Sequence, residues 1–399
     1  FVGLLLLFLV LGFTFSVTTP LGEAPDEPAH FSYAQFIAKN GRLPTTLSER
    51  AAAGYRSSWP PLYHMLVAGP IAIVGDAPPT RLKAIGDSPR RLIPTNGQTI
   101  ASFIHTNDEA WPWRGITLAW HLARLVSLLI SALAVTVTYI IAWKLTRQRW
   151  VATGTAAVYA LLPQFLFVGT MVTDDTLLIL LAGLVLLALV SLGQQESWPR
   201  GWQFGLLGIL LGLATITKYN ALPLWAIVTG WSCWLTYAIA NDGRSWFERA
   251  ARLVMALVWI GLGAALTAGW WFWFVWRNFN EVETAGWLRG SLAALTAGTA
   301  DASLRQLGAG PAIELPPLSA WFEWSIMLFK SFWGAFGGGS TIEFAGWVYG
   351  LLLVIVLVAL VGLSKYPRII PFLLIPIVFL PLPVLRFMLS DKVIETAQG

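Results

Sequence analysis

Charged residues are scarce in this sequence. Only 12% of its 399 residues are Asp, Glu, Lys or Arg, against about 25% in a typical soluble domain. Hydrophobic residues make up 56%, a share that excludes an ordinary soluble enzyme and points to an integral membrane protein. No basic run is present, so we attribute the net charge of +5 to loops and expect no nucleic-acid partner.

Cysteine pairs and the common nucleotide motifs are also missing. The single cysteine, Cys233, lies in an apolar run, so no intrachain disulfide can form. The sequence has no G-x-x-x-x-G-K-[ST] loop, no G-x-G-x-x-G after a strand, no H-E-x-x-H and no C-x-x-C. It therefore gives no sign of nucleotide hydrolysis, of a bound dinucleotide or of a thiolate metal site. We expect the substrate to arrive from the membrane or from the external side.

Long apolar runs fill most of the chain. A membrane-spanning helix needs roughly 20 apolar residues, and these runs lack the two-residue alternation of barrel strands. We therefore predict an all-α polytopic membrane protein that forms one domain over residues 1–399. The chain begins inside an apolar run without a methionine, so we expect it to be part of a longer protein. The predicted spans are residues 1–17, 120–143, 150–170, 176–193, 201–217, 221–240, 253–276, 344–364 and 369–389.

Two long polar loops separate these spans, residues 18–119 and residues 277–343. With residue 1 on the cytoplasmic side, both loops fall on the external or periplasmic face of the cytoplasmic membrane, and the short cytoplasmic loops are basic, as the positive-inside rule requires. Within the second loop, Lys330 interrupts residues 321–342, so we expect a re-entrant or interface-lying helix there. The short-loop cations are Lys144, Arg147, Arg149, Arg200, Arg244, Arg249, Arg252, Lys365 and Arg368.

The first external loop opens on the stretch "APDEPAHFSY". Pro28 suits the first position of a helix over roughly residues 28–39, with Asp26 or Glu27 as its cap. The spacing allows His30 to share a helix face with either carboxylate. One interpretation is a capped helix in a loop. The other is a general base at the membrane surface, whose pKa is set by its neighbours.

A second acidic pair, Asp174 and Asp175, directly precedes the span 176–193. As a helix cap this pair needs no function. Two carboxylates at a membrane boundary are costly when they are half buried, however, and such pairs mark a cation site or a reacting centre. Asp26, Glu27 and Asp174 could also hold a divalent cation, although nothing in the sequence fixes one.

Three cations fall on the same external side as these carboxylates. Lys218 lies in the turn "TKYN", Arg124 lies early in the second span, and Arg277 follows the aromatic run "WWFWFVW". Each alone fits snorkelling or interface anchoring, but together they could hold a phosphate or pyrophosphate. The polar side chains considered for substrate contacts are His64, His121, Tyr219 and Asn278.

The ordered motifs "PDEPAHFSYAQFIAKNGRLP", "WPPLYH", "HLARLVSLL", "TDDTLLIL", "TKYNAL", "WRN", "SFWGAFGG" and "AQG" resemble the GT-C superfamily of polytopic glycosyltransferases. The resemblance covers nearly the whole chain. It is closest to a bacterial family of membrane proteins and is more distant to protein O-mannosyltransferases and the lipid A aminoarabinose transferase. It implies a GT-C-like helical bundle, a sugar donor carried on a polyprenyl phosphate or pyrophosphate, and an acidic base in the first external loop.

Carried onto this sequence, the resemblance assigns the catalytic base to Asp26, with Glu27 next to it. It matches the second acidic site to Asp174 and Asp175, and the cations that hold the lipid phosphate to Arg124, Lys218 and Arg277. We expect Glu27 and His30 to tune the base.

Two other functions fit parts of the sequence. A non-catalytic subunit of a larger membrane assembly could keep a GT-C scaffold, since fold does not imply function. A transporter would place ionisable groups near the bilayer midplane, whereas the predicted spans are free of charge in their middles. We favour the glycosyltransferase, which would act on lipid-linked sugar in the bilayer. The acceptor and any partner subunits stay open.

Overall fold

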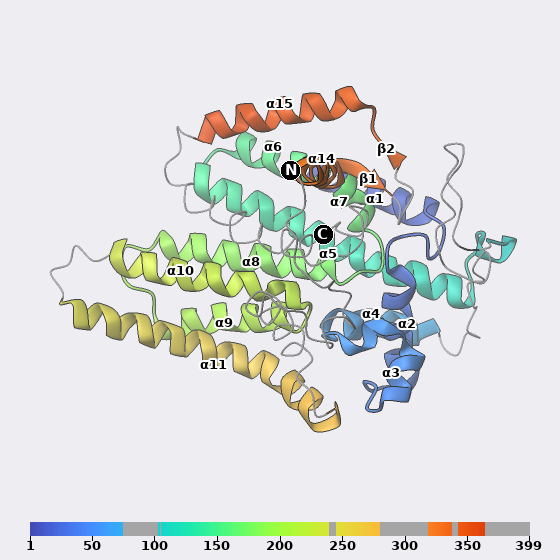
Figure 1. The fold of residues 1–399 in the computed structure, drawn as a ribbon, viewed down its shortest axis with the longest axis horizontal. Coiled ribbons are helices and arrows are strands. Elements are labelled where there is room, and N and C mark those ends of the chain that lie inside the picture. The colour runs from blue at the N-terminus through green and yellow to red at the C-terminus, as the bar shows by residue number, and fades with distance from the viewer. Residues whose placement is uncertain (75–102, 104, 239–244, 280–317, 337–341, 364–399) are drawn as a thin grey trace. The chain divides into compact units, whose positions relative to one another are not determined.

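The computed structural model describes residues 1–74, 103, 105–238, 245–279, 318–336 and 342–363. Apart from one pair of two-residue strands, the regular structure in these residues is helical, which confirms the predicted all-α fold (Figure 1). The chain divides into two compact units, Phe1–Phe279 and Asn280–Gly399, which are taken separately below. The predicted span 369–389 lies outside the described residues.

Three described helices are long and apolar enough to cross a membrane, namely α5 (Gly115–Thr146), α8 (Asp175–Gly193) and α11 (Trp246–Phe279). Each contains a predicted span. Shorter apolar helices coincide with four more of the predicted spans. They are α1 (Val2–Thr18), α9 (Gly201–Thr215), α10 (Leu222–Ala238) and α15 (Gly346–Leu363). These helices establish a multi-pass, membrane-type architecture.

The predicted span 150–170 is not one continuous helix. It is divided into α6 (Arg149–Ala160) and α7 (Pro163–Val168). Pro163 explains the break, because proline has no amide hydrogen to donate and its ring disfavours helical backbone at the preceding residue. Leu162 accordingly takes an extended conformation, with ψ 116.

The predicted polar loop 18–119 contains three short α-helices and a 3₁₀ turn between them, namely α2 (Glu27–Asn40), α3 (Leu47–Ala53), η1 (Tyr55–Ser58) and α4 (Leu62–Val74). Helix α2 starts one residue before and ends one residue after the predicted range of 28–39. Gly41 ends it with a left-handed conformation, φ 64, which glycine adopts without steric cost.

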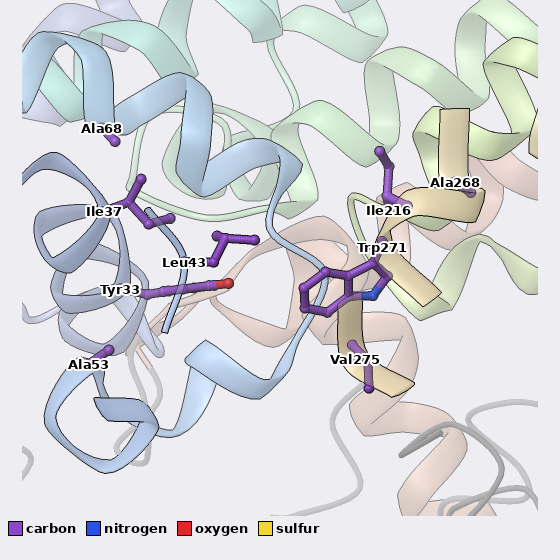
Figure 2. Close-up of a cluster of buried hydrophobic side chains, with 9 residues drawn as sticks. All are labelled: Tyr33, Ile37, Leu43, Ala53, Ala68, Ile216, Ala268, Trp271 and Val275. Atoms are coloured by element: carbon purple, nitrogen blue, oxygen red, sulfur yellow. The ribbon is translucent and has the colours of Figure 1, made fainter. Parts of the chain in front are cut away.

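A buried apolar cluster attaches these loop helices to α9 and α11 (Figure 2). Tyr33 and Ile37 of α2 belong to the same cluster as Trp271 and Val275 of α11. The backbone amide of Leu62 also donates to the carbonyl of Ile216, at 3.1 Å, next to the turn that follows α9. This turn is therefore fixed against the start of α4. The other members of the cluster are Leu43, Ala53, Ala68, Ile216 and Ala268.

Helices α9 and α11 pack at backbone contact, side by side in Figure 1. A Cβ added to Gly208 would lie 2.1 Å from the Ile260 carbonyl oxygen, and one added to Gly263 would lie 2.1 Å from the Gly205 carbonyl oxygen. Only glycine allows such an approach, as at other small-residue helix interfaces. The close packing holds the end of α9 in a defined place.

The second unit contains α14 (Leu318–Gly334), the strands β1 (Ala335–Phe336) and β2 (Ile342–Glu343), and α15. The strands pair antiparallel, with Ala335 opposite Glu343. Lys330 Nζ lies 2.6 Å from Glu343 Oε2. The segment 321–342, predicted as one re-entrant or interface-lying helix, is helical only as far as Gly334.

Candidate functional site

Several elements of the first unit bring ionisable side chains into one region. They are the start of α2, the turn η1, the start of α4, the start of α8 and the turn after α9. We call this group the ionisable cluster. Its members are Asp26, His30, Tyr55, Arg56, His64, Asp174, Asp175 and Lys218.

Asp26 occupies the N-cap position of α2, but its side chain does not cap the helix. Its backbone is left-handed, with φ 59, a conformation that aspartate tolerates better than most residues. The carboxylate instead accepts hydrogen bonds from the Tyr55 hydroxyl and from Arg56 Nη2, each at 2.5 Å. Burial would raise the pKa of Asp26, yet Tyr55 and Arg56 together hold it below its usual value. Asp26 is thus an ionised carboxylate whose side chain is 51% exposed.

Tyr55 and Arg56 were missed by the sequence reasoning. Arg56 is buried, and its guanidinium lies over the Trp59 ring, 4.5 Å from the ring centre. Arginine suits this setting because its planar cation can stack on an aromatic face and pair with a carboxylate. The signal that could have found it is a single arginine within the aromatic and proline-rich stretch "YRSSWPP".

His30 and His64 form a buried imidazole pair. His30 Nδ1 lies 2.9 Å from His64 Nε2, and the other nitrogen of His30, Nε2, lies 3.9 Å from Asp174 Oδ1. Burial lowers the pKa of both histidines to about 3. Both rings are therefore neutral near pH 7, so one ring donates and the other accepts within the pair.

The second acidic site contacts the predicted lysine. Lys218 Nζ lies 2.6 Å from Asp175 Oδ1 and 2.9 Å from Asp174 Oδ1. The side chain of Asp174 is fully buried, whereas that of Asp175 is 40% exposed. Asp174 makes no side-chain cap to α8. The structure thus brings these three residues together across the turn after α9 and the start of α8.

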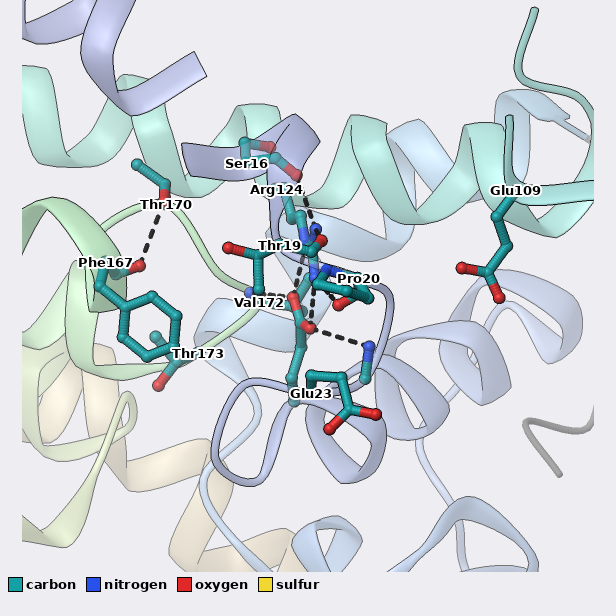
Figure 3. A network of polar contacts seen from close by, with 12 residues as sticks. Ser16, Thr19, Pro20, Glu23, Glu109, Arg124, Phe167, Thr170, Val172 and Thr173 are labelled. Carbon is teal, nitrogen blue, oxygen red and sulfur yellow. Dashed lines mark hydrogen bonds and ion pairs between the residues drawn. The ribbon is translucent and has the colours of Figure 1, made fainter. Parts of the chain in front are cut away.

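Glu27 and Arg124 form a separate buried ion pair. Figure 3 shows Arg124 beside Ser16, Thr19 and Pro20 at the end of α1. Arg124 donates through Nε and Nη2 to the two carboxylate oxygens of Glu27, each at 2.7 Å. Its remaining hydrogens go to the carbonyl oxygens of Ser16, Thr19 and Pro20. A guanidinium has five N–H groups, and all five are used here. Arg124 therefore has no free donor for the predicted phosphate contact in this geometry.

Glu27 accepts further hydrogen bonds, and its contacts are with Arg124 and with backbone amides. Besides Arg124, it accepts the amides of Gly22, at 3.2 Å, and Val172, at 3.0 Å. The next amide, that of Thr173, donates to the Tyr63 hydroxyl at 3.0 Å. Two consecutive amides of the loop before α8 thus donate to side chains of the polar loop 18–119. This arrangement fixes the loop that presents Asp174.

The remaining side chains predicted for phosphate or substrate contacts do not contact the ionisable cluster through any hydrogen bond or ion pair among the described residues. Arg277 and Asn278 are exposed at the end of α11, where Asn278 donates to its own helix at Phe274. The Tyr219 hydroxyl accepts from Trp271 Nε1 at 3.1 Å. His121, on α5, stacks on Trp113 with ring centres 3.8 Å apart.

In the part of the chain that the structure describes, no group of three or more His, Cys, Asp or Glu side chains is placed to hold a metal ion. The three carboxylates considered for a divalent cation each contact a cationic side chain instead. Asp26 contacts Arg56, Glu27 contacts Arg124, and Asp174 contacts Lys218.

Comparison with known families adds an independent finding. Residues 110–273 match the family described as dolichyl-phosphate-mannose-protein mannosyltransferase, which is consistent with the resemblance to the GT-C superfamily. The matched segment contains Asp174, Asp175 and Lys218, whereas Asp26 precedes it. The match indicates a glycosyltransferase type of function for a multi-pass membrane protein. No curated protein matches the chain.

Proposed function

We propose that this protein transfers a sugar from a polyprenyl-phosphate or polyprenyl-pyrophosphate donor to an acceptor on the external face of the cytoplasmic membrane. The observation that carries the proposal is the ionisable cluster, in which an ionised, half-exposed carboxylate shares one site with two buried cations. The family matched by residues 110–273 is named for a dolichyl-phosphate-linked mannose, which supports a donor of this chemical kind.

The cluster supplies the two things that this reaction needs. Asp26 accepts the proton of an acceptor hydroxyl or amine as the acceptor attacks the anomeric carbon of the sugar. The bond between that carbon and the phosphate oxygen breaks, and its electron pair leaves with the phosphate. Lys218 stabilises the negative charge of the leaving phosphate. Arg56 and Tyr55 keep Asp26 ionised and fix its direction.

The positions of these groups suit a lipid donor and a water-borne acceptor. Lys218 lies in the turn that joins the apolar helices α9 and α10 and is buried against Asp174 and Asp175. Asp26 lies in the first polar loop and is half exposed. In the proposed reaction the lipid-linked donor meets Lys218 at this turn and the acceptor meets Asp26.

The activity is tested by incubating the purified full chain, in lipid nanodiscs, with a series of polyprenyl-phosphate sugars. We expect transfer to an added acceptor or slow hydrolysis of the donor, and less of both in Lys218→Gln. If the wild-type protein shows neither with any lipid-linked sugar tried, the non-catalytic subunit becomes the better interpretation.

The external position of the site is tested separately by cysteine labelling. In a Cys233→Ser background, Ser48→Cys lies on the exposed side of α3 and Gln148→Cys lies at the exposed start of α6. A membrane-impermeant thiol reagent applied from outside should label the first and miss the second. The reverse pattern would place the site on the cytoplasmic face.

A further inference from the structure

Two carboxylates in the ionisable cluster share one ammonium group. Asp175 Oδ1 has the shorter contact with Lys218, 2.6 Å against 2.9 Å for Asp174 Oδ1. Lys218 is aligned as a hydrogen-bond donor to Asp175. The contact with Asp174 is longer, and apart from this shared lysine the carboxyl of Asp174 has no hydrogen-bond donor among the described residues. Asp174, the more deeply buried of the two carboxyls, thus has the longer contact with Lys218.

Counting charges around Asp174 shows what this sharing implies. Asp26 and Arg56 form one ion pair, and Asp175 and Lys218 form another. An ionised Asp174 would add a third negative charge with no cation of its own. In a buried setting an unpaired charge is costly, and a group in that position takes up a proton instead. Burial accordingly raises the pKa of Asp174 above its usual value.

His30 provides the acceptor that a protonated Asp174 needs. Its Nε2 lies 3.9 Å from Asp174 Oδ1, which is longer than a hydrogen bond, and it is the side-chain nitrogen of His30 on that side. His30 and His64 are both neutral, so each ring carries one N–H proton. If Nε2 of His30 accepts from Asp174, the proton of His30 is on Nδ1, which then donates to Nε2 of His64. The titratable and charged groups that face Asp174 from the surrounding elements are His30, Arg56, Tyr63, His64, Asp175 and Lys218.

We propose that Asp174 holds a proton in the resting protein, directed toward Nε2 of His30, while Nδ1–H of His30 donates to Nε2 of His64. In this state Lys218 is neutralised by one carboxylate and not by two. The cluster then presents less negative charge to an anionic phosphate. His30 and His64 act as positioning residues that stabilise the neutral form of Asp174. The link to phosphate rests on the proposed function, whereas the proton on Asp174 does not.

The proton is tested by difference infrared spectroscopy on the full chain in nanodiscs. We expect a carboxylic-acid band at neutral pH that is absent in Asp174→Asn. The band should also be lost in Asp175→Asn, because Lys218 then pairs with Asp174 alone and ionises it. Asp108→Asn, an exposed residue of the turn η2 (Asn107–Glu109), serves as the matched control and should leave the band unchanged. If the Asp174→Asn spectrum keeps every carboxylic-acid band of the wild type, the proposal is overturned.

The tautomers are tested by nitrogen NMR of histidine-labelled protein, which is tractable because the chain has only four histidines. His30→Gln and His64→Gln assign the signals of the pair. We expect Nε2 of His30 to carry no proton and Nδ1 to carry one. A proton found on Nε2 of His30 at neutral pH would mean that His30 donates to an ionised Asp174, which contradicts the proposal.

The link to phosphate is tested with pyrophosphate as the probe, by calorimetry across a pH range. Wild-type binding should weaken by at least about tenfold as Asp174 loses its proton with rising pH, since one buried charge is added beside the ligand. Asp174→Asn cannot ionise, so it should lack this loss, and it also controls for ionisation of the probe itself. If pyrophosphate binds neither protein, the phosphate role of Lys218 in the proposed function fails. The infrared and NMR results would still decide the proton on Asp174.

Discussion

Arg124 and Glu27 form a bidentate ion pair in the buried interior of the first unit, although 97 positions separate them in the sequence. The pair joins the end of α1, the start of α2, α5 and the loop before α8. Through the amide of Val172 it also fixes the segment that presents Asp174. Arg124 and Glu27, which the sequence suggests as a phosphate ligand and a tuning acid, thus contact each other and hold the loop before α8.

This support predicts a loss of stability on substitution. Glu27→Gln leaves the Arg124 cation buried without its anion, and removing one partner of such a pair costs about 3–5 kcal/mol. Thermal unfolding in detergent should therefore shift to a clearly lower temperature. Arg42→Gln, which breaks an exposed ion pair with Glu49, is the control and should have little effect. A Glu27→Gln protein as stable as wild type, but with weakened donor binding, would restore the ligand role.

Lys218 and Arg277 provide a matched test of the phosphate contact. Lys218 lies in the ionisable cluster, whereas Arg277 is exposed at the end of α11. Lys218→Gln should raise the apparent KM for the donor by an amount that corresponds to about 1–3 kcal/mol. Arg277→Gln should leave it nearly unchanged. Equal effects of the two substitutions on the KM would contradict the prediction that Lys218, and not Arg277, contacts the donor phosphate.

The buried histidines predict that acid destabilises the protein. The pKa of His30 and that of His64 are lowered from 6.5 to about 3 in the fold. Between these values the unfolded chain binds protons that the folded chain does not, so stability falls as the pH drops below about 6.5. The unfolding temperature should decrease on acidification from pH 7 to pH 5. His30→Gln combined with His64→Gln should flatten that dependence, and a slope as steep as in wild type would assign it to other groups.

The packing of α9 against α11 predicts opposite effects at two nearby glycines. A methyl group at Gly263 would meet the Gly205 carbonyl oxygen at 2.1 Å, whereas one at Gly261 meets nothing within 4 Å. Gly263→Ala should cost about 1–3 kcal/mol through overpacking. Gly261→Ala should be neutral or stabilising by about 0.5–1 kcal/mol, because alanine favours the helix. Comparable unfolding temperatures for the two variants would contradict the close helix contact.

The helices were largely predictable because their signal is local. Apolar runs located α5, α8 and α11, and Gly41 marked the end of α2. The break at Pro163 was missed because the apolar run continues on both sides of it. At this position Pro163 indicates a helix break even though the hydropathy stays high.

The candidate site was predictable in its residue types but only partly in its pairings. Asp26, Asp174 and Lys218 were selected from the sequence, and the structure brings Lys218 to Asp174. The partners of Arg124 and Asp26 come from distant segments, so no local spacing could reveal them. Arg56, for example, lies 30 positions from Asp26 and contacts it only because η1 folds back over the start of α2.

The central claim is that Asp26 is the base of a sugar transfer from a polyprenyl-linked donor, and one comparison tests it most directly. Turnover of a polyprenyl-phosphate sugar should be measured for wild type, Asp26→Asn and Tyr55→Phe, together with donor binding and unfolding temperature. Asparagine keeps the size of aspartate and its tolerance of the left-handed backbone, so the fold and donor binding should persist. Turnover should fall by about 10²–10⁴-fold in Asp26→Asn and by less in Tyr55→Phe. Full turnover by Asp26→Asn, with donor bound as in wild type, would contradict the account.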